Sequence, residues 1–246
     1  MQIFILGNQR SGTTFLYQLI CAFYKVGYIN NLMAKFPDDP AKGVKFGRDL
    51  LKDSRQISFH SEYGNTPEMT DPSEFGWFWR QFLNLNAPMS NGQMDAVDWD
   101  GLQKALSSIK QAWGGIPIVY KCAGMGFHAK EVASNISDSV FLMIRRNEED
   151  VITSTLSASI ERLGDRNAHY GFRPPLPDVQ NWSPQTKARV GHQVRATNEL
   201  MNKAVEDIHY SRILHIGYED LVKSPFSSLS EIQHHFSLKP SMIEEE

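Results

Sequence analysis

The sequence contains little cysteine, no long apolar run and no excess of basic residues. Its two cysteines, Cys21 and Cys122, are too few for a disulfide framework or a structural zinc site. No stretch approaches the roughly 18 consecutive apolar residues of a membrane-spanning helix. The apolar run after Met1 is too short for a signal peptide and lacks a basic flank. These absences predict a soluble cytoplasmic protein that has no membrane partner.

Acidic residues slightly outnumber basic ones. The chain has 246 residues, with 25 Lys+Arg against 28 Asp+Glu and a net charge of −3. Binding of duplex nucleic acid requires a basic surface, so we expect no nucleic-acid partner. Apolar residues make up 41 % of the chain, which excludes disorder as its main state. Because no linker and no repeat divides the chain, residues 1–246 are expected to form one domain.

Short apolar runs alternate with helical patterns along the chain. Runs that are apolar throughout are typical of strands in a parallel sheet covered on both faces. They are Ile3–Leu6, Ile116–Tyr120, Val140–Ile144 and Ile213–Ile216, with Gln56–Phe59 as a weaker fifth. Helical patterns begin near Gly12, Asp100, Asn147, Ser183 and Ser224. The predicted fold class is therefore α/β, a single domain with a P-loop-like parallel sheet and helices on both faces.

The most specific motif is the loop Gly7-Asn8-Gln9-Arg10-Ser11-Gly12-Thr13-Thr14, which joins the first strand to the first helix. Glycines allow a tight turn, backbone N–H groups converge on an anion, and the helix N-terminus adds partial positive charge. The spacing matches the nucleotide-binding pattern G-x-x-x-x-G-K-[ST], except that Thr13 replaces the lysine. The cation of the loop is Arg10, whose guanidinium donates paired hydrogen bonds to oxyanions. The loop therefore predicts a phosphate site without the lysine of an NTPase.

The segment Arg10-Ser11-Gly12-Thr13-Thr14 resembles the 5′-phosphosulfate-binding loop of sulfotransferases that use 3′-phosphoadenosine 5′-phosphosulfate (PAPS). The resemblance implies that the hydroxyls of Ser11, Thr13 and Thr14 and the backbone of Gly12 hold the phosphosulfate. It implies that Arg10 stabilises the leaving group.

A second anion site is predicted where a strand ends in Arg145 and Arg146, directly before a helix that Asn147 caps. Ser154 lies two helical turns after Asn147 and therefore on the same helix face. Arg146 and Ser154 resemble the family's 3′-phosphate motif, in which a serine follows an arginine by eight positions. Arg145 is the alternative if the register shifts by one residue.

Two further residues are expected near the nucleotide. Lys121 ends the strand Ile116–Tyr120, and open α/β sheets bind ligands at the carboxyl ends of their strands. It contacts the phosphosulfate or the acceptor, or it is an ordinary partly buried lysine. Tyr218 begins a Tyr-Glu-Asp-Leu segment that resembles the one before the family's last helix, where it closes the far end of the nucleotide site.

Transfer to a hydroxyl or amine requires a base. The candidates follow the weak strand Gln56–Phe59, and we rank Glu62 first and His60 second, with Glu68 and Glu74 further along. Family members with arginine in the loop tend to use a glutamate from this region.

Acceptor contacts are expected from three segments, Val26–Arg55, Trp77–Asp98 and Gly164–Trp182, of which the first and last read as irregular. Phe75 and Trp79 fit one helical face, which predicts core packing. Trp77 and Phe78 fall off that face, so they are candidates for the wall of an acceptor pocket.

The sequence thus predicts an enzyme that moves a sulfuryl group from PAPS, its co-substrate, to a hydroxyl or amine by in-line displacement, without a metal. The acceptor is a small molecule or a carbohydrate, and the sequence leaves the oligomeric state open. One alternative is a P-loop nucleotide or small-molecule kinase, which the missing loop lysine disfavours. Another is a catalytically silent module that binds the nucleotide and transfers nothing.

Overall fold

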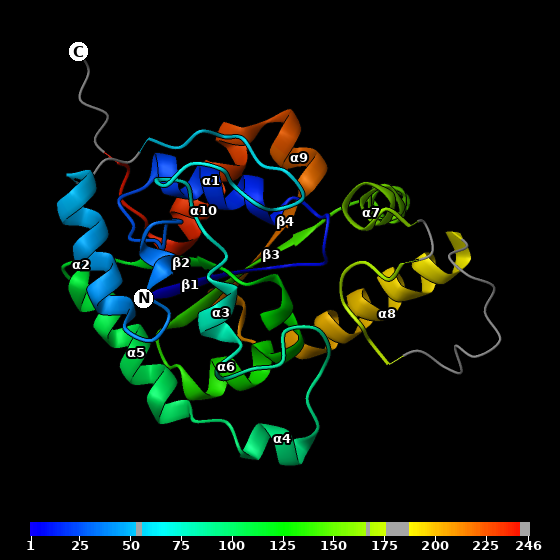
Figure 1. Cartoon of the computed structure of the whole chain (residues 1–246), viewed down its shortest axis with the longest axis horizontal. Helices are drawn as coiled ribbons and strands as arrows, with labels where there is room; N and C mark the ends of the chain where they lie inside the picture. Colours follow the sequence, from blue (N-terminus) through cyan, green and yellow to red (C-terminus); the bar gives the residue numbers. More distant parts are fainter. Residues whose placement is uncertain (53–55, 166–167, 176–186, 242–246) are drawn as a thin grey trace.

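Figure 1 shows the chain as a computed structural model, which describes residues 1–52, 56–165, 168–175 and 187–241. Parallel strands form one sheet in the order β2-β1-β3-β4. They are β1 (Gln2–Leu6), β2 (Ile118–Lys121), β3 (Ser139–Arg145) and β4 (Ile213–Gly217). Every residue of the central strand β1 and of the edge strand β2 is buried, as expected for a parallel sheet covered on both faces. The four apolar runs predicted as strands are confirmed.

Helices cover both faces of this sheet (Figure 1). One face packs against α1 (Thr13–Phe23), α9 (Tyr218–Lys223) and α10 (Pro225–Phe236). The other face packs against α3 (Gly76–Trp79), α5 (Trp99–Ala112), η2 (Ala123–His128), α6 (Ala129–Asn135) and α8 (Lys187–Val205). The predicted α/β fold with helices on both faces is therefore confirmed.

The remaining helices lie around this three-layer core. They are η1 (Met33–Lys35), α2 (Pro40–Leu51), α4 (Asn91–Asp95), α7 (Glu148–Leu163) and η4 (Tyr210–Arg212). An apolar cluster of Val151, Ile152, Val190 and Val194 joins α7 to α8. Within the described ranges, no helix combines the length and the apolar character needed to cross a bilayer.

Local signals set the helix ends that were predicted. The Asn147 side chain accepts hydrogen bonds from the backbone N of Glu149 at 3.0 Å and of Asp150 at 3.4 Å, so it caps α7. Pro225 lies in the first turn of α10, where its missing N–H costs nothing. The predicted start at Ser183 lies outside the described residues, and α8 is described from Lys187.

The predicted fifth strand at Gln56–Phe59 is wrong, because the structure describes these residues and gives them no strand. The fully buried Asp71 accepts hydrogen bonds from the backbone N of Ser58 at 2.8 Å and from its hydroxyl at 2.6 Å. The hydroxyl of Thr70 also donates to the carbonyl of Gln56 at 2.8 Å. The polar groups of this segment are therefore satisfied by side chains and not by a neighbouring strand.

The expectation that Val26–Arg55 is irregular is also wrong, since it contains the helix α2. Asp39 caps this helix by accepting from the backbone N of Lys42 at 3.0 Å. A Cβ added at Gly43 would lie 2.6 Å from the carbonyl oxygen of Met33, so glycine permits the close packing of α2 on η1. Gly43, a residue type that often ends helices, is here the point at which two helices touch.

Both cysteines are buried. Burial raises the pKa of the Cys122 thiol well above its usual range. A thiol with a raised pKa stays protonated and unreactive, and Cys122 is part of the apolar core.

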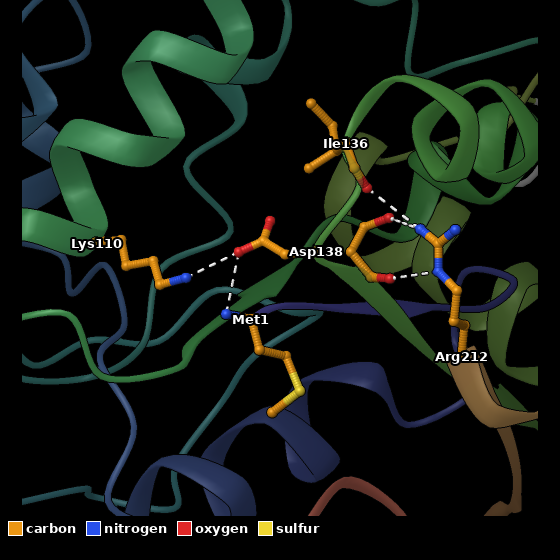
Figure 2. Close-up of polar contacts among 6 residues, drawn as sticks. Met1, Lys110, Ile136, Asp138 and Arg212 are labelled. Carbon is orange, nitrogen blue, oxygen red and sulfur yellow. Dashed lines mark hydrogen bonds and ion pairs between the residues drawn. The ribbon is translucent and has the colours of Figure 1, made fainter.

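Charged groups connect the amino-terminal ends of the strands, which lie at the end of the sheet opposite the loop after β1 (Figure 2). Lys110 Nζ lies 2.8 Å and the terminal ammonium of Met1 lies 3.1 Å from Asp138 Oδ2. Partial burial raises the pKa of Asp138, but the hydrogen bonds from Lys110 and the ammonium outweigh it and lower the pKa overall. Arg212 donates to the carbonyl of Ser139 at 3.0 Å, to its hydroxyl at 2.7 Å and to the carbonyl of Ile136 at 3.2 Å.

We expect Arg212→Met to lower the free energy of unfolding by about 2 kcal/mol, because several partly buried acceptors lose a charged donor. Urea denaturation measures this change. Arg195→Met is the control, since Arg195 makes an exposed ion pair with Glu148 that stabilises by about 1 kcal/mol at most. Equal losses in the two variants would contradict a specific role for Arg212.

Candidate functional site

The loop between β1 and α1 forms part of the wall of a cavity of about 520 Å³ at the carboxyl ends of the strands. Arg10 has a φ of 64° and Gly12 a φ of 91°, so the backbone turns sharply twice. A Cβ at residue 12 would lie 2.2 Å from Cδ2 of Tyr218, which explains the glycine. Among the described residues, no side chain caps α1. The first turn of α1, with Thr13 and Thr14 in the cavity wall, is therefore suited to an anion.

Arg10, Arg146 and Ser154 meet beside this loop. Arg10 Nε donates to the hydroxyl of Ser154 at 2.9 Å, and Arg146 Nη1 donates to the Arg10 carbonyl at 3.1 Å. The Arg146 guanidinium carbon lies 4.5 Å from the centroid of the Tyr218 ring. Within the part of the chain described, the buried Nε of Arg146 has no hydrogen-bond partner. An unpartnered buried donor is costly, and an anion bound in the cavity would satisfy it.

The neighbouring Arg145 lies elsewhere. Its Nη2 donates to Oδ1 of Asn202 at 2.9 Å, and the side chain lines a smaller cavity of about 180 Å³ behind the loop. Ser11 lines that smaller cavity as well, and its buried hydroxyl donates to the carbonyl of Asn8. The structure thus brings Arg146, and not Arg145, into the wall of the large cavity, where it bonds to Arg10, which in turn bonds to Ser154. It turns the Ser11 hydroxyl inward to brace the loop.

The two highest-ranked base candidates do not reach the large cavity. His60 and Glu62 are exposed, and neither lines it, although their neighbours Ser61 and Tyr63 do. Glu74, which the sequence ranked lower, is the one acidic side chain among the described residues that line the cavity. Its Oε2 lies 3.2 Å from Nζ of the buried Lys121 at the end of β2.

Tyr63 covers Arg10. The Arg10 guanidinium carbon lies 4.8 Å from the centroid of the Tyr63 ring, and that of Arg162 lies 5.9 Å from it. The Tyr63 hydroxyl also hydrogen-bonds to the carboxylate of Glu161 on α7. Sequence reasoning missed Tyr63, because its partners are close only after α7 has packed beside the loop that carries it.

Positive charge dominates the large cavity. Among the described residues of its wall, four are cationic, namely Arg10, Arg80, Lys121 and Arg146, and one is anionic, Glu74. This excess stands out in a chain whose net charge is −3. No group of three or more His, Cys, Asp or Glu side chains that could hold a metal ion is found in the described ranges. The cavity is therefore suited to a ligand with several negative charges.

A second cavity, of about 320 Å³, adjoins the first. The two share wall residues Gly64, Glu74, Arg80, Asn86 and Phe172. Trp77 lines the second cavity and is 75 % exposed. Phe78, the other aromatic candidate for a pocket wall, is instead buried and stacked on Phe75 at 4.7 Å between ring centroids. The prediction that Phe78 lines an acceptor pocket is wrong, because the turn of α3 directs its ring into the core.

The described part of the segment Gly164–Trp182 closes one side of both cavities. The backbone N of Phe172 donates to Oε1 of Gln9 at 3.3 Å. Gln193 Nε2 on α8 donates to the carbonyls of Tyr170 at 2.8 Å and of Phe172 at 2.9 Å. These bonds fix the segment against both the loop and α8.

A parallel sheet whose first strand runs into a glycine-containing loop and a helix, with a cationic cavity at the carboxyl ends, defines a P-loop-like α/β protein. A sequence model described as the sulfotransferase family matches residues 2–241. The chain belongs to the sulfotransferase family. A comparison with curated protein sequences gives no match.

Solved structures of sulfotransferases share this fold. The sulfotransferase domain from the curacin biosynthetic pathway is 15 % identical, with a TM-score of 0.53 over 98 % of this chain and 75 % of that one. Sulfotransferase STF1 from Mycobacterium tuberculosis is 15 % identical, with a TM-score of 0.58 over 98 % and 68 % of the two chains. Sulfotransferase STF9 from Mycobacterium avium is 14 % identical, with a TM-score of 0.57 over 96 % and 63 %.

Proposed function

We propose that this protein is a sulfotransferase that uses PAPS as its donor and a hydroxyl or amine as its acceptor. The observation that carries the proposal is the cluster of Arg10, Arg146 and Ser154 beside the uncapped start of α1. The donor carries phosphate groups at two positions of its ribose. The loop and Arg10 would hold the 5′ side, and Arg146 with Ser154 would hold the 3′-phosphate. Tyr218, which packs on Gly12 and lies under Arg146, would close the nucleotide end of the site.

The residues of the large cavity supply what sulfuryl transfer requires. A new bond forms between the acceptor oxygen or nitrogen and sulfur, and the bond from sulfur to the leaving phosphate oxygen breaks. Negative charge then develops on the phosphate, and Arg10 and the N–H groups of α1 are positioned to stabilise it. Lys121 adds a further positive group. It lies at the end of β2, the strand that pairs with β1.

For the base we propose Glu74, in place of the order inferred from the sequence. Glu74 is part of the wall common to both cavities, so it meets a donor in one and an acceptor in the other. In this position its carboxylate accepts the proton that the acceptor loses. Glu62 and His60 remain the comparison residues, because they lie on the same segment but outside the cavity wall.

The observations do not favour a kinase. Thr13 occupies the place of the lysine that contacts the β- and γ-phosphates in P-loop nucleotide enzymes. No hydrogen bond joins Thr14 to a carboxylate among the described residues, whereas Mg²⁺-dependent phosphoryl transfer uses such a carboxylate on the metal. Binding of desulfated donor without Mg²⁺ and absence of ATP turnover would agree with the sulfotransferase.

Calorimetry with the desulfated donor, adenosine 3′,5′-bisphosphate, in Mg²⁺-free buffer tests the donor site. We expect Arg146→Gln to weaken binding by about 10- to 150-fold, because it removes charged hydrogen bonds to a phosphate. Arg145→Gln is the matched control, since Arg145 bonds to Asn202 away from the large cavity. Binding that is lost equally in both variants, or unchanged in both, would remove Arg146 from the donor site.

A further inference from the structure

The 320 Å³ cavity next to the donor site has a polar wall. Asn65, Thr66, Ser73 and Asn86 contribute amide and hydroxyl groups to it. Asn65 and Asn86 hydrogen-bond to other described residues through their backbone atoms only, so their side-chain amides have no partner among those residues. Both residues are exposed to solvent, so their amides are free to hydrogen-bond to a ligand. The wall is suited to a ligand with several hydroxyl groups.

Arg80 gives this cavity an uncompensated positive charge. It follows α3 directly and lines both cavities. Among the described residues, no acidic side chain forms an ion pair with it, because Glu74 pairs with Lys121. A guanidinium without a partner in a cavity wall is a ready site for a carboxylate, which it binds through two parallel hydrogen bonds.

Trp77 stands beside Arg80. The two residues are three positions apart in a single helical turn, so they lie on neighbouring points of one face. The Trp77 ring is 75 % exposed although most large apolar side chains of this chain are buried, and it lines the same cavity. An exposed indole offers a flat surface on which a ring can pack while polar groups at the ring's edge stay hydrated.

We propose that the acceptor is an acidic sugar of the uronate type. This inference rests on the proposed function and names its acceptor class. The carboxylate of the sugar pairs with Arg80, its ring packs on Trp77, and its hydroxyls bond to Asn65 and Asn86. In this placement one hydroxyl faces Glu74 at the junction of the two cavities.

The test uses methyl β-glucuronide and methyl β-glucoside, which differ in a carboxylate against a hydroxymethyl group. Ligand-observed NMR titration of the full chain, with and without saturating adenosine 3′,5′-bisphosphate, gives both affinities. We expect the glucuronide to bind at least 10-fold more tightly than the glucoside. In Arg80→Gln the two sugar affinities should agree within about 2-fold. Arg80 also lines the donor cavity, so some loss of nucleotide affinity is compatible with the proposal, and measurable nucleotide binding shows that the variant is folded.

Arg195→Gln is the control, because Arg195 is exposed on α8, pairs with Glu148 and lines neither cavity. It should keep the full preference for the glucuronide. Equal binding of the two sugars, no binding of either, or a preference that survives in Arg80→Gln overturns the acidic-sugar proposal. If the parent protein fails to bind the nucleotide, the proposed function is overturned instead. The titration without nucleotide then still shows whether Arg80 causes the preference for the glucuronide.

Discussion

Arg10→Ala is expected to lower kcat for PAPS-dependent transfer by about 10³-fold, the loss typical of removing one preorganised group that stabilises developing charge. Arg10 lines the large cavity and is held there from two sides, by Ser154 at 2.9 Å and by the Tyr63 ring at 4.8 Å. Its guanidinium is therefore in place before the reaction begins. The release of adenosine 3′,5′-bisphosphate from PAPS, followed by chromatography in the presence of a set of sugar and phenol acceptors, measures this loss.

Two further variants separate charge from packing at this position. Arg10→Lys keeps the charge and should recover part of the rate, although it loses the paired hydrogen bonds. Arg162→Ala removes the other cation that lies against Tyr63, from outside the cavity wall. It should stay within about 3-fold of the parent protein. If Arg162→Ala were as slow as Arg10→Ala, the effect would come from a disturbed Tyr63 loop and not from the leaving group.

Glu74→Gln is expected to lower kcat by about 10²- to 10⁴-fold, the contribution usual for a positioned base. The amide keeps the shape of the side chain but cannot accept a proton. Binding of adenosine 3′,5′-bisphosphate should persist, because its proposed contacts come from other residues: the loop after β1, Arg146, Ser154 and Tyr218.

The comparison variants are Glu62→Gln, His60→Asn and Lys121→Met. The first two change exposed side chains outside the cavity wall and should keep kcat within about 3-fold of the parent protein. Lys121→Met removes the ion-pair partner of Glu74 and shows how much of the loss comes from breaking that pair. A large loss of kcat in Glu62→Gln or His60→Asn, with a near-parental kcat in Glu74→Gln, would move the base to the residue concerned.

The elements and the donor loop could be predicted because their signals are local. Residues of β1 are buried on both faces and are therefore apolar at every position. The loop after β1 needs glycine at residue 12, where any side chain would collide with Tyr218. Arg146 and Ser154 were predicted from the geometry of one strand end and one helix; in the structure Arg10 lies between them, since it bonds to both.

Tertiary structure alone decided which carboxylate enters the cavity. Glu62 and Glu74 both lie in a segment without helical or strand periodicity, so nothing in their spacing indicates a direction. The buried Asp71 binds the backbone and hydroxyl of Ser58 and so folds this segment back on itself. As a result, Glu74 meets Lys121 at the end of β2, while Glu62 points to solvent.

Side-chain contacts between distant elements likewise created the second cavity and the cover over Arg10. Tyr63 meets α7, and Phe172 meets the loop through Gln9, although these pairs are far apart in the sequence. The sequence therefore determined the sheet and the loop that follows its first strand. The placement of Glu74 and the shape and charge of the second cavity arose only when segments without a periodic pattern packed against the finished sheet.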